Sequence, residues 1–206
     1  MVEKHLSARW NGLLAIAIVA SALLWAGQTA NCQQSGAQDA GSQHAGIDPA
    51  LLAKANAGDA AAQVAVGESY VASKGVAQNY KAAAEWYQKA ADKGDIGGEL
   101  HLAALYRDGG KGVPRDMTQA AVWYQKAAGQ GDVTAQGTMG TLYSMGLGVE
   151  QNYVEAYYWL DLAAAVKGPK QAQYAANRQM IGMHITADEL AAVQDREAAW
   201  KAAHPR

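Results

Sequence analysis

Residues 131–149 read Gly-Asp-Val-Thr-Ala-Gln-Gly-Thr-Met-Gly-Thr-Leu-Tyr-Ser-Met-Gly-Leu-Gly-Val. The pattern occurs twice upstream, beginning at Gly94-Asp95 and at Gly58-Asp59, so the units start 36 and 37 residues apart. Glycine suits the left-handed position just past a helix end, and aspartate suits the N-cap of the next helix. Each Gly-Asp pair therefore predicts the end of one helix and the start of another.

Other positions recur in the same order at matching steps. They are Tyr70, Tyr106 and Tyr143, then Gly75-Val76, Gly112-Val113 and Gly148-Val149, then Trp86, Trp123 and Trp159, and finally Ala90-Ala91, Ala127-Ala128 and Ala163-Ala164. In the first unit we expect one helix over 60–72 and a second over 80–91, joined by a glycine-rich turn. A repeat of this length built of helix pairs predicts an all-α fold, an α-α superhelix that forms a short solenoid of antiparallel pairs.

The sizes of the repeated residues explain why the pairs would stack. Small residues leave holes that let the helix backbones approach closely, at Ala62, Gly98 and Ala135, at Gly67, Ala103 and Gly140, and at Ala83, Ala120 and Ala156. The recurring tyrosines and tryptophans can fill the space between neighbouring units. One helix pair cannot bury both of its faces, so a stack of about three units is the minimum expected to be stable.

The repeats occupy about 55–91, 92–128 and 129–165, inside a solenoid domain that we place at 48–206. A short helix after Asp48-Pro49 precedes the first unit. The pattern fades in the cap, 166–206, where Asn177 replaces the small Gly140 and Met180 replaces Tyr143. Thr186 and Glu189 form a capping-box pattern, which predicts a last helix ending near Ala202.

The pattern resembles the Sel-one-like repeat, a relative of the tetratricopeptide repeat with slightly longer units. The resemblance rests on 131–149 and on Trp-Tyr-Gln-Lys-Ala-Ala at 86–91 and 123–128, and it covers about 55–173. Departures include Ser73 for a turn glycine and an extra residue in 109–112. The resemblance implies an adaptor whose concave face, lined by the first helix of each unit, holds a partner protein or peptide.

The N-terminus has the features of an export signal. Lys4 and Arg9 precede an uncharged apolar run from Leu13 to Gly27, so residues 1–30 are predicted to be a signal peptide or a signal anchor. Three outcomes stay open: cleavage, retention as a membrane anchor, and lipidation at Cys32, the only cysteine. Residues 31–47 are rich in Gln, Ser, Gly and Ala and predict a flexible linker. We therefore expect a location in the periplasm or cell envelope.

Composition and motifs argue against several classes of function. The formal net charge of −2 gives no basic footprint for nucleic acid. The chain contains no Gly-x-Ser-x-Gly, Ser-x-x-Lys or His-Glu-x-x-His motif and no metal-ligand spacing, so we expect no catalytic residues, no cofactor and no metal. The leading hypothesis is a protein-binding scaffold. The alternative is an envelope hydrolase or peptidoglycan-binding protein that uses the same groove. The sequence leaves the oligomeric state open.

Candidate binding residues are the polar positions of the first helices that the repeat does not fix. They are Glu68, His101, Asp108, Thr138 and Thr141. His101 stands out because its equivalents are Ala65 and Thr138, so the repeat itself does not require histidine there. Together they predict a polar, mildly acidic strip that prefers a polar or basic partner segment.

Overall fold

The computed structural model describes residues 46–205. The predicted signal, residues 31–45 of the predicted linker and Cys32 lie outside the described residues, whereas Ile47, at the end of the predicted linker, is buried in the core. Between 46 and 205 the chain forms helices and no strand, apart from one isolated bridge between Gly110 and Val113, which confirms the all-α prediction. The helices are α2 (Pro49–Asn56), α3 (Ala60–Val71), α4 (Tyr80–Ala91), α5 (Ile96–Asp108), α6 (Met117–Gly129), α7 (Val133–Met145), α8 (Tyr153–Ala164), α9 (Gln171–Gly182) and α10 (Ala187–Ala203).

The Gly-Asp pairs work as the sequence predicts. The aspartates Asp59, Asp95 and Asp132 precede α3, α5 and α7, and each carboxylate accepts the amide N–H three residues on at 2.7–2.8 Å. The glycine before each aspartate has a positive φ of 76–97°, which glycine adopts without a Cβ penalty. These local signals place the start of each first helix.

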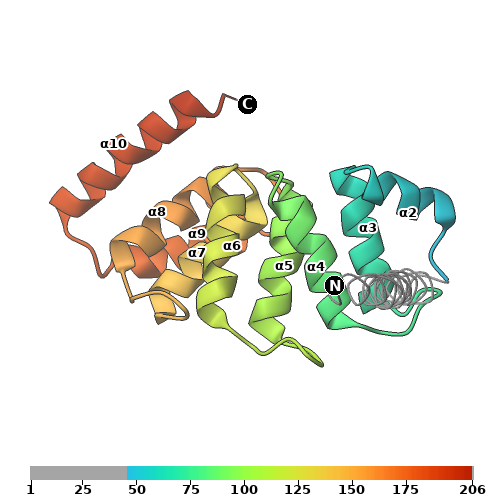
Figure 1. Cartoon of the computed structure of the whole chain (residues 1–206). Coiled ribbons are helices and arrows are strands. Elements are labelled where there is room, and N and C mark those ends of the chain that lie inside the picture. The colour runs from blue at the N-terminus through green and yellow to red at the C-terminus, as the bar shows by residue number, and fades with distance from the viewer. Residues whose placement is uncertain (1–45, 206) are drawn as a thin grey trace, which may run out of the picture. The chain divides into compact units, whose positions relative to one another are not determined.

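The helices form antiparallel pairs, α3 with α4, α5 with α6 and α7 with α8, and each pair packs on the next (Figure 1). The small residues are where the backbones meet. A Cβ at Gly67 would lie 2.5 Å from the ring of Tyr87, and one at Gly140 would lie 2.5 Å from Leu160. The side chain that fills the hole is therefore the one after the repeated tryptophan. The three tryptophans are buried, at 5–7% exposure.

The cap keeps an aromatic contact at a different position. Met180, at the position of the repeated tyrosine, is exposed, but Tyr174 is buried against α7, where a Cβ at Gly137 would meet its ring at 2.1 Å. The predicted capping box is confirmed, since Thr186 N–H donates to Glu189 Oε2 at 2.7 Å and Glu189 N–H donates to Thr186 Oγ1. The last helix, α10, packs mainly on α8, and its Trp200 lies beside Gly131.

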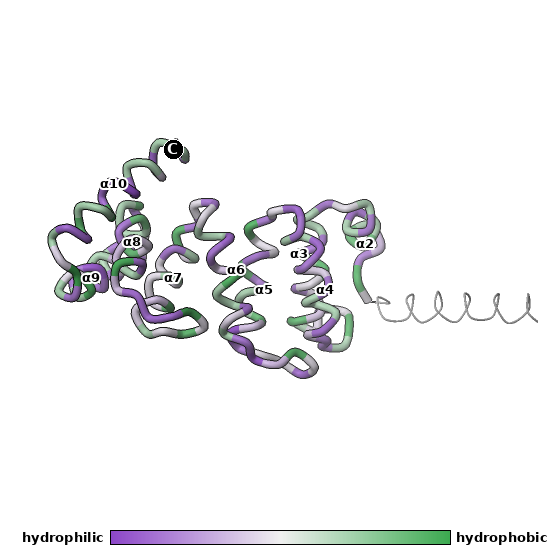
Figure 2. The backbone as a smooth tube through the Cα atoms, turned by 60° about the vertical axis from the view of Figure 1, so that its left-hand side comes forward, coloured by the Kyte–Doolittle hydropathy of each residue, from purple (hydrophilic) through white to green (hydrophobic). Residues whose placement is uncertain are grey.

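Hydrophilic (purple) and hydrophobic (green) residues are interspersed along the helical part of the chain (Figure 2). Within residues 46–205 no helix combines the length and the apolar character needed to cross a bilayer.

Candidate functional site

Two of the five predicted binding residues are in direct contact. Glu68 lies on α3 and His101 on α5, and Glu68 Oε1 is 3.2 Å from His101 Nε2. Both side chains are about half exposed. The pair therefore joins the first helices of units one and two at the surface, where a partner can reach it.

The ring of His101 also stacks on an aromatic residue of the core. Its centroid lies 4.9 Å from that of Tyr87 on α4, with 12° between the ring planes. Burial, and to a smaller extent the charge of Glu68, raises the pKa of Tyr87 above its ordinary value, so the phenol stays protonated. Tyr87 holds His101 in place because it is itself fixed by packing against Gly67.

A cavity of about 280 Å³ opens beside this stack. Residues of α4 and α5 and the end of α3 line it, among them Tyr80, Tyr87, His101, Leu105 and Asp108. Ligand pockets for small molecules typically measure about 300–1,000 Å³. The cavity lies just below this range and has room for a side chain of a protein partner.

Asp108 is held by a residue that the sequence analysis did not single out. Arg107 donates two hydrogen bonds of 2.8 Å to the carboxylate of Asp108 and a third, of 2.9 Å, to the hydroxyl of Tyr124. The hydrogen bonds from Arg107 lower the pKa of Asp108 below its usual value. The guanidinium also balances the charge of Asp108, so Glu68 supplies most of the negative charge of the groove.

Thr138 and Thr141 do not join this cluster. They lie on α7, and their hydroxyls donate to carbonyls of their own helix, to Thr134 at 2.7 Å and to Gly137 at 3.1 Å. Both are at least partly exposed and occupy the positions equivalent to His101 and Ala104. They belong to the corresponding surface of the next unit, not to the cavity beside His101.

Tyr80 is a lining residue that the sequence analysis missed. It begins α4, and Gln78 Nε2 donates to its hydroxyl at 3.0 Å and to the carbonyl of Val71 at 2.9 Å. The signal was present in the sequence, because Gln-Asn-Tyr at 78–80 recurs at 151–153. There, Gln151 binds Tyr153 and Ser144 in the same way. The motif fixes the turn and sets a tyrosine at the mouth of the groove.

In the part of the chain that the structure describes, no three His, Cys, Asp or Glu side chains are arranged to hold a metal.

Comparisons with known proteins identify relatives of the repeats that carry this site. A family model described as the Sel1 repeat matches residues 60–95, 98–132 and 134–165. A protective antigen of uropathogenic Escherichia coli with an SLR fold is similar, with 35% identity and a TM-score of 0.62 over 73% of this chain and 32% of that one. A Sel1 repeat protein from Oxalobacter formigenes has 34% identity and a TM-score of 0.55 over 59% of this chain and 49% of that one. The chain thus spans a third to a half of these relatives. No curated protein matches.

Proposed function

Because the chain belongs to the Sel1 repeat family, whose members are generally protein-protein interaction scaffolds, we propose that it is a non-catalytic scaffold of the bacterial cell envelope. Its partner would be a protein or peptide segment held on the concave face formed by α3, α5 and α7. Solenoids of this type are typically non-catalytic, which agrees with the lack of catalytic motifs in the sequence.

The Glu68–His101 pair beside the α4–α5 cavity is the observation that carries the proposal. A carboxylate next to flat aromatic rings suits an arginine or lysine, because the cation can pair with the acid and lie on a ring face. Arg107 already neutralises Asp108, so recognition of a basic residue would rest mainly on Glu68. A short groove with one side-chain cavity favours an extended peptide or a single helix as the bound segment.

The envelope location rests on the sequence of residues 1–30. Its basic start and apolar run are those of an export signal, and an anchor or a lipid on Cys32 would hold the repeats at the membrane.

The test is recovery of the partner followed by disruption of the groove. The full chain with a C-terminal tag is cross-linked in cells, and proteins bound to it in the envelope fraction are identified by mass spectrometry. Glu68→Lys combined with His101→Ala should reduce recovery of the partner, because the acid is reversed and the ring stack is lost.

Glu85→Lys is the matched control, since it reverses an exposed acid on α4, the second helix of the same unit. A partner that binds the groove variant as well as the parent, but is lost with Glu85→Lys, would place the binding surface on the second helices. Sedimentation of the protein with purified peptidoglycan, in place of any protein partner, would favour the cell-wall alternative.

A further inference from the structure

Helix α9 corresponds to the first helix of a fourth unit. One face of it is open, whereas the equivalent face is covered in the three complete units. Ala135 and Met139 of α7 are fully buried, as are Val66 of α3 and Leu102 of α5 at the Met139 position. One repeat step further, the equivalents of Ala135 and Met139 are Ala172 and Ala176 on α9, and both are exposed. In the first three units, α4, α6 and α8 pack as second helices on α3, α5 and α7. On α9 none of the described helices takes that place.

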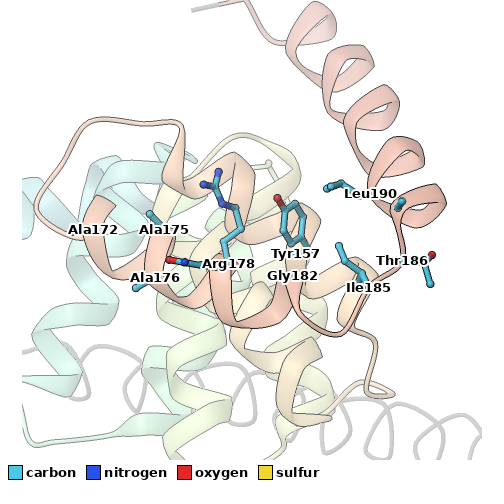
Figure 3. Close-up of a pocket in the computed structure, with 11 residues that line it drawn as sticks. Tyr157, Ala172, Ala175, Ala176, Arg178, Gly182, Ile185, Thr186 and Leu190 are labelled. Atoms are coloured by element: carbon cyan, nitrogen blue, oxygen red, sulfur yellow. The ribbon is translucent and has the colours of Figure 1, made fainter.

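An open cleft of about 830 Å³ lies along this face. Figure 3 shows Ala172, Ala175, Ala176 and Gly182 along α9, with Tyr157 between Arg178 and the start of α10. The small residues leave space on the surface of α9, so a helix that binds there would have to supply the large side chains. Met180 and Met183, at 57% and 77% exposure, extend the apolar surface of this end, and methionine adapts readily to different partners.

The last helix of the chain, α10, packs on another helix. Val193 and Glu197 of α10 are buried, and α10 packs mainly on α8. Arg196 of α10 pairs with Glu155 of α8. Among residues 46–205, therefore, no segment covers the open face while α10 holds these contacts.

The charged residues around α9 indicate which kind of helix would bind to its open face. No acidic residue lies between Asp161 and Asp188, while Lys167, Lys170 and Arg178 are basic. Arg178 pairs with Asp161, and the two lysines are exposed. A helix with an acidic flank would complement them.

A second copy of this chain is a poorer occupant. Its α2 matches the second helix of a unit, and no first helix precedes it within the described residues 46–205, but Lys54 of α2 stands at the position of the fully buried Ala90. A lysine at this contact position opposes stacking of one copy on the next.

We propose that the open face of α9 docks an acidic amphipathic helix of a partner protein, in the place that a second helix takes in each complete unit.

The probe is a peptide with the sequence of α8, Tyr153–Ala164, which carries Glu155 and Asp161 and no basic residue. A side-chain staple on its polar face keeps it helical, because isolated helices shorter than about 12–15 residues are marginal in water. Titration of the full chain by fluorescence anisotropy should give saturable binding. Ala176→Arg should weaken it at least about tenfold, because the arginine fills the cleft.

Ala198→Arg is the control, since it adds the same side chain at an exposed position of α10. A second variant, Lys167→Glu with Lys170→Glu, should weaken binding at low salt and leave the folded structure intact by circular dichroism. Glu68→Lys should leave peptide binding unchanged, which separates this surface from the groove of the proposed function.

Absence of saturable binding up to about 1 mM, or equal binding by Ala176→Arg and the parent, would overturn the proposal. Concentration-dependent self-association that Ala176→Arg abolishes would also overturn it, because the occupant would then be a second copy.

Discussion

Glu99 is a buried acid at a position where the neighbouring units carry glutamine. Gln63 and Gln136 each donate an amide hydrogen to a carbonyl eight residues back, of Ala55 at 3.0 Å and of Ala128 at 3.2 Å. Glu99, at 3% exposure, has no such donor when ionised, and its Oε2 accepts a hydrogen bond of 2.8 Å from Gln130. Burial raises the pKa of Glu99, so folding disfavours its charged form.

Glu99→Gln should therefore stabilise the protein at pH 8 by about 1 kcal/mol, because the amide can donate to the carbonyl of Ala91. The raised pKa of Glu99 means that the parent loses stability as the pH rises above the unfolded value of about 4.3, so the advantage of the variant should shrink at pH 5. Urea unfolding at the two pH values measures it. A variant less stable than the parent at pH 8 would contradict this account.

Trp123 is buried at 7% exposure in the middle unit, and Lys126 Nζ lies 3.7 Å from the centroid of its ring. Trp123→Ala should lower the free energy of unfolding by about 3–5 kcal/mol, as large aromatic deletions in cores do. The control is Val122→Ala, which alters a neighbour at 45% exposure and should change stability by less than about 0.5 kcal/mol. Equal melting temperatures for Trp123→Ala and the parent would mean that the ring does not support the core.

The candidate groove was only partly predictable at this scale. The repeat register marked Glu68 and His101 as free positions, and in the structure they meet. The register carries no information on side-chain partners, however. It therefore gave no hint that Arg107 would neutralise its neighbour Asp108, or that Thr138 and Thr141 would lie apart from His101.

At the scale of the helix, the contact of Tyr174 of α9 with α7 depends on Gly137. Alanine normally stabilises a helix interior relative to glycine by about 1 kcal/mol, but a Cβ here would lie 2.1 Å from the ring of Tyr174. Gly137→Ala should therefore destabilise the protein, by about 1–3 kcal/mol. Gly129→Ala is the control, because nothing lies within 4 Å of its Cβ position, and it should raise the melting temperature. The same sign of change in both variants would argue against the tight contact.

The attachment of α10 to α8 should depend on pH. Glu197 of α10 is buried next to Asp161 of α8, with Arg178 and Lys201 as the nearby bases. Burial, and then the hydrogen bond with Asp161, raises the pKa of Glu197 to about 7. The protonated form can donate to Asp161, whereas the ionised form repels it.

Stability from Glu197 should be fully present below its unfolded pKa of about 4.3 and lost as the pH rises through about 7. Glu197→Gln, which stays neutral, should flatten this loss between pH 5 and pH 8. Hydrogen exchange of the α10 amides, corrected for the intrinsic pH dependence, is the measurement. Equal pH dependence in the variant and the parent would rule out Glu197 as the source.

Helix positions were the most predictable feature. The second helix of unit one was expected at 80–91 and is found there, because Gly-Asp pairs and caps act within a few residues. The cap was less predictable. Tyr174 takes over the aromatic contact from a position that the repeat leaves variable, and α10 turns back to α8 through pairs such as Arg196–Glu155 that have no repeat precedent.

For the molecule as a whole, export remains a prediction. Fractionation of producing cells should place the protein in the envelope, and its mass compared with the full 206 residues reports cleavage. Labelling with a radioactive fatty acid, lost in Cys32→Ala, would identify lipidation. Full-length protein found only in the cytosol would contradict the predicted signal.

Packing between neighbours along the chain has a consequence for how the protein folds. Each helix from α2 to α8 packs on the next one in sequence, so contacts are mostly local and the search for the native state is short. We expect the units to fold one after another as the chain emerges from an export channel, N-terminal unit first. The last helix, α10, lies against α8 and contacts Gly131 before α7. We therefore expect α10 to dock last and, once docked, to slow unfolding that starts at the C-terminal end.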